Sequence, residues 1–174
     1  MAKTLEEPEF EILRRYKEFE VRKYVSTIQA RVTSDNPRND APSIAFRRIA
    51  NYIFGNNERA ESIAMTAPVH TWTSEGSSIM AFTLPSEHEF DDLPVPNDGG
   101  IDLLQVEGEV VAVLGFSGFS GQRKTLKLQS KLRSLVEKEN LTPLAEAKLA
   151  VYDHPGTLPF IRRNEIHLPI EWTT

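Results

Sequence analysis

One order of segments occurs twice along the chain, and this repeat restricts the possible folds more than any other feature. In each copy a strand is followed by a helix and then by two further strands. The segments are 28–32, 42–54, 69–73 and 79–85 in the first copy, and 110–116, 122–139, 147–152 and 165–170 in the second. Two such halves can pair into a strongly bent antiparallel sheet or barrel. We therefore predict an α+β fold: a distorted antiparallel β-barrel from two pseudo-repeats, flanked by two α-helices.

Hydrophobic periodicity supports these elements. Phe46, Ile49 and Ile53 recur at helical spacing and form one apolar stripe. Residues 110–114 are apolar on both faces, which predicts a strand in the centre of the sheet.

The apolar phase changes between the two strands that precede the first helix. Phe19 and Val21 occupy odd positions, whereas Ile28 and Ala30 occupy even ones. Because a slip of one residue exchanges the two faces of a strand, we predict a bulge or bend near Lys23.

Length and composition indicate an ordinary globular chain. With 174 residues, 40% hydrophobic and 26% charged, we expect a flexible tail over 1–8 and a single domain over 9–172. A net charge of −5 argues against a nucleic-acid partner. The absence of cysteine excludes disulfides, thiolate catalysis and Cys-ligated zinc. We see neither a secretory signal nor an apolar run that could span a bilayer, so we expect a soluble, cytoplasmic protein.

Three blocks of sequence resemble the SOUL heme-binding family and occur in that family's order. The blocks are 24–32 leading into 45–57; 61–69, with its Met-Thr-Ala-Pro-Val core; and 151–170, with a tyrosine, a proline-rich turn and an Arg-Asn-Glu run. Together the resemblance covers about residues 8 to 171. It implies a distorted β-barrel flanked by two helices, and heme or a related tetrapyrrole as the ligand.

The chain has four histidines, at His70, His88, His154 and His167. No two have the spacing of a helical zinc pair, but imidazole is the natural protein ligand for a heme iron. We rank His154 first as the metal ligand, because it sits in the rigid turn beside Tyr152, and His70 second. Tyr152 is itself predicted to line the ligand site. His167 alternates with apolar neighbours and is expected to point away from the core face.

One position departs from the resemblance. Some family members carry a histidine directly before the tyrosine of the second strand, where this chain has Lys23. A protonated lysine has no lone pair for iron. Either the iron is held elsewhere, or apolar contact alone holds the macrocycle, or this member does not bind heme.

A porphyrin is a large apolar plate with propionates at one edge, so apolar walls beside arginines suit it. The predicted walls are Phe46, Ile49, Ile53, Met65, Phe116 and Phe160. The predicted propionate partners are Arg47, Arg48, Arg162 and Arg163. Such a groove would lie near the helix at 42–54 and the corner at 151–163. The alternative is that Phe46, Ile49 and Ile53 are core residues. Met65 could offer a soft sulfur ligand to the iron, or it could fill a gap in the core.

Three functions stay open. The first is a soluble carrier or buffer of heme, which hands its ligand over. The second is an enzyme that acts on bound heme, for example by removing iron. The third is a barrel domain for other apolar ligands or protein partners. Enzyme motifs are weak: neither Ser117 nor Ser120 has glycines at both the −2 and the +2 position, as a nucleophile elbow requires. No dinucleotide or Walker A pattern occurs either.

Overall fold

The computed structural model describes residues 4–35, 42–153 and 157–173. Its contacts divide the chain into two compact units. Unit 1 contains Met1–Pro8 and Ser26–Glu107, and unit 2 contains Glu9–Val25 and Gly108–Thr174. Each unit has its own antiparallel strands, one α-helix and one hydrophobic core.

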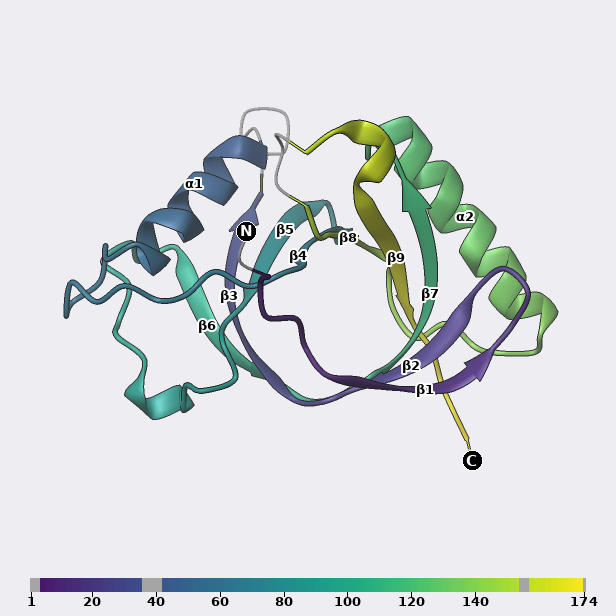
Figure 1. The fold of residues 1–174 in the computed structure, drawn as a ribbon, viewed down its shortest axis with the longest axis horizontal. Helices are drawn as coiled ribbons and strands as arrows, with labels where there is room; N and C mark the ends of the chain where they lie inside the picture. Colours follow the sequence, from purple (N-terminus) through teal and green to yellow (C-terminus); the bar gives the residue numbers. More distant parts are fainter. Residues whose placement is uncertain (1–3, 36–41, 154–156, 174) are drawn as a thin grey trace. The chain divides into compact units, whose positions relative to one another are not determined.

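Unit 1 places α1 against a group of four strands (Figure 1). Its elements are β3 (Thr27–Ser34), α1 (Pro42–Ile53), β4 (Val69–Ser74), β5 (Ser77–Thr83), the short 3-10 helix η1 (Phe90–Asp92) and β6 (Ile101–Val106). The strands lie in the order β4-β5-β3-β6. The apolar stripe of α1 packs on β3 and β5, where Ile49, Tyr52 and Ile53 are at most 1% exposed.

Unit 2 repeats the strand, helix and two strands of this plan, and β1 and β2 from the N-terminal part of the chain bring its strands to five, one more than in unit 1. Its elements are β1 (Phe10–Arg15), β2 (Glu20–Tyr24), β7 (Val110–Ser117), α2 (Gln122–Lys138), β8 (Lys148–Val151), the 3-10 helix η2 (Pro159–Ile161) and β9 (Arg163–Pro169). The strands lie in the order β1-β2-β7-β9-β8. Leu132 and Val136 of α2 are buried against the side chains of β7 and β9.

The structure confirms the predicted α+β class and the pseudo-repeat. In both units a strand, a helix and two strands follow one another, and the strands are antiparallel and curved (Figure 1). The segment Phe82-Thr83-Leu84-Pro85 of unit 1 is similar to Ile166-His167-Leu168-Pro169 of unit 2. The two segments face the same way: Phe82 and Leu84 lie in the core of unit 1, and Ile166 and Leu168 lie in the core of unit 2. As predicted, β7 is central, because it pairs with β2 on one side and β9 on the other.

The predicted change of apolar phase near Lys23 falls at the end of a strand. β2 ends at Tyr24 and β3 begins at Thr27, and the two strands belong to different units. The register irregularity in this part of the chain lies instead in β1, between Ile12 and Arg14. The phase therefore changes because the chain leaves one group of strands and enters another.

The predicted domain bounds, a flexible tail over 1–8 and one domain over 9–172, stay a prediction. Within that tail, Glu6 forms a bridge with Thr66, and its carboxylate accepts a hydrogen bond from the backbone N–H of Ser86. Residue 6 thus has fixed partners in unit 1. Among the described residues, no helix is long and apolar enough to cross a membrane.

Candidate functional site

A buried ion pair between β2 and β9 forms the centre of the candidate site. Arg22 Nη1 and Nη2 donate to Glu165 Oε1 and Oε2 at 3.0 and 2.9 Å. The two side chains are only 9% and 8% exposed. Both strands pair with β7, so the two residues lie on one face of the sheet one strand apart. The bidentate geometry offsets part of the cost of removing two charges from water.

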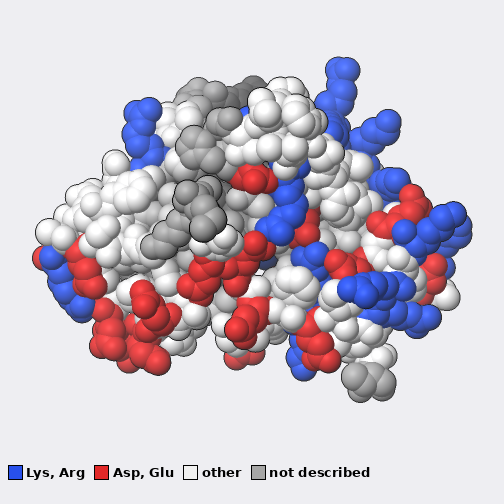
Figure 2. Space-filling model, viewed as in Figure 1, with Lys and Arg blue, Asp and Glu red and all other residues white. Residues whose placement is uncertain are grey.

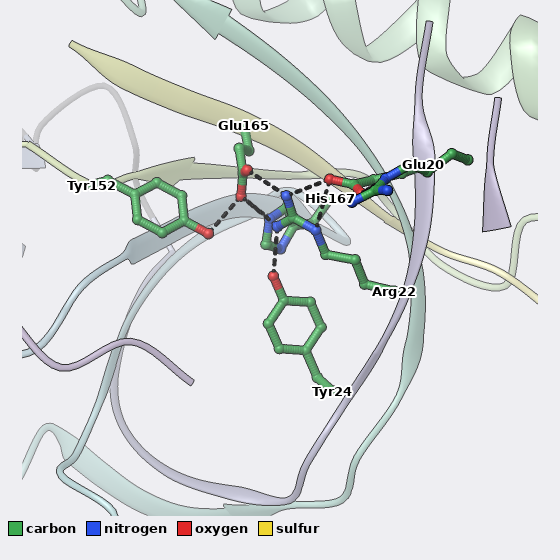
Figure 3. Close-up of polar contacts among 7 residues, drawn as sticks. Glu20, Arg22, Tyr24, Tyr152, Glu165 and His167 are labelled. Carbon is green, nitrogen blue, oxygen red and sulfur yellow. Dashed lines mark hydrogen bonds and ion pairs between the residues drawn. The ribbon is translucent and has the colours of Figure 1, made fainter. Parts of the chain in front are cut away.

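Four further polar side chains complete this network, which we call the Glu165 cluster (Figure 3). Tyr152 donates its hydroxyl to Glu165 Oε1 at 2.5 Å, and His167 Nε2 lies 3.0 Å from the same oxygen. Arg22 also donates to Glu20 Oε1 at 2.8 Å and to the Tyr24 hydroxyl at 2.9 Å. Every polar group at the centre therefore has a partner, as buried charges require.

Burial and the neighbouring groups shift the pKa values of Glu165, Tyr152 and Tyr24. Burial opposes the charge on Glu165, but hydrogen bonds from His167 and Arg22 outweigh it and hold the pKa of this carboxyl well below its usual range. Burial, together with the negative charge of Glu165, raises the pKa of the Tyr152 phenol far above its ordinary value. Burial also raises the pKa of Tyr24. The cluster thus holds an ionised pair and two neutral phenols.

The Arg162–Arg163–Asn164–Glu165 run connects this cluster to the surface, and each member has its own contact. Arg162 Nε donates to the Thr157 carbonyl at 2.7 Å, and its guanidinium lies 5.4 Å from the centre of the Phe119 ring. The Arg163 guanidinium stacks on Tyr152 at 3.8 Å. Asn164, 1% exposed, donates to the Gly118 carbonyl at 2.9 Å. The run therefore fixes the segment before β9 and the turn before α2.

These two segments carry a set of exposed apolar side chains, which we call the apolar corner. Its members are Phe119, Leu158, Phe160 and Ile161, with exposed fractions of 63, 56, 74 and 59%. Exposed apolar side chains are common singly, but a group on two neighbouring segments indicates a contact surface. Because the run from Arg162 to Glu165 is anchored in the interior, the corner is held in place from within.

In unit 2 the predicted site residues lie in or next to this arrangement. Phe160, Arg162 and Arg163 lie at the corner, and Tyr152 lies in the Glu165 cluster. Phe116 is half-buried, packs against the core and has the Lys124 ammonium over its ring at 5.2 Å. His154, ranked first as the iron ligand, lies outside the described residues.

In unit 1 the predicted residues divide between core and surface. Ile49 and Ile53 are fully buried between α1 and the strands, so their side chains face the core. Met65 is half-buried and packs against the same core, and Phe46 is 36% exposed with its ring 5.3 Å from that of Phe82.

The polar candidates of unit 1 also differ in their surroundings. Arg48 donates to both carboxylate oxygens of Asp98, at 2.7 and 2.8 Å, while Arg47 is exposed. That hydrogen bonding to Arg48, with the Gly100 N–H, lowers the pKa of Asp98 to about 2. His70 lies half-buried in β4.

Sequence reasoning missed the buried members of the cluster. His167 does point away from the core helix, as predicted, yet it is 4% exposed because Tyr24 and Glu165 cover it. Arg22 and Glu165 are 143 residues apart, so no local pattern pairs them. The available signal was the alternation of Glu20, Arg22 and Tyr24 along one strand, which places three polar side chains on one face.

The described residues contain no group of three or more His, Cys, Asp or Glu side chains placed to hold a metal ion. Comparison with known families gives a match to the model described as SOUL heme-binding protein, over residues 5–169. The chain belongs to the SOUL heme-binding protein family. This match confirms the resemblance seen in the three sequence blocks.

Individual relatives are distant. The chain is 27% identical over 146 residues to Heme-binding protein 1 of Sus scrofa, covering 78% of this chain and 74% of the relative. It is 29% identical over 124 residues to Heme-binding protein 2 of Homo sapiens, covering 67% of this chain and 58% of the relative.

Solved structures share the fold at still lower identity. An uncharacterized conserved protein from Listeria innocua has a TM-score of 0.67 and 11% identity, covering 89% of this chain and 93% of that one. The EcmrR C-terminal domain has a TM-score of 0.63 and 11% identity, covering 90% of this chain and 98% of that one. At such identities the likeness concerns the fold alone.

Proposed function

We propose that this chain binds heme or a related tetrapyrrole at the apolar corner of unit 2 and serves as a cytoplasmic carrier or buffer. Membership of the SOUL family and the names of its relatives, Heme-binding protein 1 and 2, support the ligand class. The observation that carries the site is the apolar corner itself, with two arginines next to it.

The chemistry of the corner suits a porphyrin. Phe119 and Phe160 offer two exposed rings, against which a flat macrocycle gains contact area and stacking energy. Arg162 and Arg163 follow directly and are the proposed partners of the propionates, because a guanidinium binds a carboxylate through two parallel hydrogen bonds. A ligand held on a surface exchanges readily, which favours handover.

The Glu165 cluster limits the choice of an iron ligand. Tyr152 would have to bind as tyrosinate, but burial and Glu165 keep its phenol protonated. His167 Nε2 faces Glu165 inside the cluster. Of the sequence candidates, His154 remains the first proposal and His70 the second.

Hemin titration followed by the Soret band tests the proposal. We expect one saturable site in the wild-type protein, and an affinity about tenfold lower for Phe160→Ser, because a large contact surface is lost. Phe54→Ser in unit 1 is the matched control, since it also removes an exposed phenylalanine, one that is 66% exposed and not among the predicted walls. An unchanged affinity in Phe160→Ser would place the ligand elsewhere, and a Soret band that never saturates would contradict binding.

Two companion measurements separate the remaining alternatives. Loss of the Soret shift in His154→Ala or His70→Ala would name the axial ligand. Product analysis after incubation distinguishes a carrier from an enzyme, because a carrier returns heme unchanged. Recovery of iron-free or cleaved tetrapyrrole would favour the enzymatic reading.

A further inference from the structure

A long segment of unit 2 is basic although the whole chain is acidic. Residues 110–136 contain no Asp or Glu, whereas the net charge of the chain is −5. The basic residues of this segment, all in α2, are Arg123, Lys124, Lys127, Lys131 and Arg133. In Figure 2, Lys and Arg side chains project along the part of unit 2 that contains α2. The segment thus presents a cationic surface.

Three of these residues have partners within unit 2: Lys124 donates to the Ser117 carbonyl at 2.8 Å, Lys131 pairs with Glu18 at 3.1 Å and Arg133 donates to the Ala145 carbonyl at 3.4 Å. Helix stability does not explain the position of Arg123. Arg123 and Lys124 lie in the first turn of α2, and no acidic residue accompanies them there. The helix dipole is positive at this end, so cations in the first turn are unfavourable. Arg123 and Lys127 are both exposed, and their spacing of four places them on the same side of the helix. Their position points to an external anionic partner.

The apolar corner lies at the same end of the helix. Phe119 comes just before α2, and the guanidinium of Arg162, which follows η2, lies 5.4 Å from the centre of the Phe119 ring. Leu126 on α2 adds another exposed apolar side chain, at 55%. Large apolar groups therefore project from the surface next to exposed cations.

We propose that unit 2 docks on an anionic lipid bilayer through this surface. The apolar corner would enter the boundary between headgroups and acyl chains, while Arg123 and Lys127 contact lipid phosphates. An anionic membrane binds such a surface in two ways: apolar side chains are buried at the boundary between headgroups and acyl chains, and basic residues are attracted to the anionic lipids. This inference does not rest on tetrapyrrole binding, because the docking surface includes α2 and acts without a bound ligand.

Vesicle sedimentation of the ligand-free protein tests the proposal. We expect binding to vesicles of phosphatidylcholine with phosphatidylglycerol, little binding to phosphatidylcholine alone, and weaker binding at high salt. The double variant R123E/K127E should bind at least about 25-fold more weakly, since each cation near an anionic surface contributes about fivefold. The double variant R14E/K17E on the β1–β2 hairpin changes the net charge equally and should bind like wild type.

A second variant tests the apolar contribution. F119S/I161S should weaken vesicle binding by about tenfold, because less apolar area enters the bilayer. The proposal would be overturned by equal binding to neutral and anionic vesicles, by no binding to either, or by equal losses in R123E/K127E and R14E/K17E. Self-association in light scattering that F119S/I161S abolishes would also overturn it, since the surface would then join two copies. Hemin titration without vesicles reports separately on the proposed ligand site.

Discussion

The two units bury different side chains at two equivalent strand positions. The repeated segments align Phe82 with Ile166, so Ala81 and Thr83 of β5 occupy the places of Glu165 and His167 of β9. All four residues are buried, but only unit 2 buries a charged group there. Since unit 1 forms the same arrangement with neutral side chains, the fold itself does not require the Glu165 cluster.

The connection before each strand suggests what the cluster does. In unit 1, β4 and β5 are joined by the tight turn at Glu75 and Gly76, which both have positive φ. In unit 2, β8 ends at Val151 and β9 begins at Arg163. A long connection has many more accessible conformations than a two-residue turn, so it needs contacts with the rest of the protein to hold one of them. Contacts of Tyr152, Arg163 and Glu165 fix both of its ends, and we conclude that the buried charge holds the apolar corner.

The largest expected effect is the loss of Glu165. Glu165→Ala leaves Arg22 buried without its main partner, which should lower the free energy of unfolding by about 3–5 kcal/mol. The position of unit 1 equivalent to Glu165 is already an alanine, Ala81, so the comparison uses Thr83, which is equivalent to His167. Thr83→Ala should lower the free energy of unfolding by about 1 kcal/mol or less. Urea denaturation measures both free energies of unfolding. Similar losses in the two variants would show that the buried ion pair does not make β9 more important for stability than β5.

A smaller loss is expected for Asn164→Ala. The change removes a buried hydrogen bond to the Gly118 carbonyl, with an expected cost of about 1–3 kcal/mol. Hydrogen exchange of the 117–121 amides should quicken more than that of β7. Uniform exchange across unit 2 would mean that Asn164 supports the whole sheet rather than this turn.

Tyr152→Phe should have a milder effect. It removes one hydroxyl from a carboxylate that keeps Arg22 and His167, so the expected loss is about 1 kcal/mol. Thermal unfolding measures it. A loss as large as that of Glu165→Ala would show that the tyrosine, and not the ion pair, organises the cluster.

The smallest effect concerns acid stability. The folded pKa of both Glu165 and Asp98 is lowered, so each stabilises the fold above the ordinary carboxyl pKa and loses that contribution as pH falls through its folded pKa. Glu165→Gln and Asp98→Asn should each flatten the decline of stability between about pH 5 and pH 2. We expect Glu165→Gln to flatten it more, because Asp98 lies nearer to solvent. The reverse order in urea titrations across this range would contradict the comparison.

The sequence predicted elements well because periodicity is local. Phe46, Ile49 and Ile53 placed α1, and the alternation of Ile166 and Leu168 placed β9 with its facing. Candidate site residues were less predictable, because helical spacing does not distinguish a core residue from a ligand wall: Ile49 and Ile53 face the core.

The Glu165 cluster was not predictable for a different reason. Its ion pair joins residues 143 positions apart, and only the order of strands brings them together. His167 was unpredictable for the same reason. The alternation of apolar residues predicts correctly which face of the strand His167 is on, but its side chain is buried by Tyr24, which lies on another strand.

Hemin titration of Asn164→Ala and Tyr152→Phe tests the central claim most directly, because both variants keep every side chain of the apolar corner. If the interior of unit 2 holds the corner in place for a tetrapyrrole, both variants should bind hemin several-fold more weakly than wild type, and Thr83→Ala should bind normally. Wild-type affinity in both folded variants would contradict the account, since the corner would then bind without the contacts that hold it.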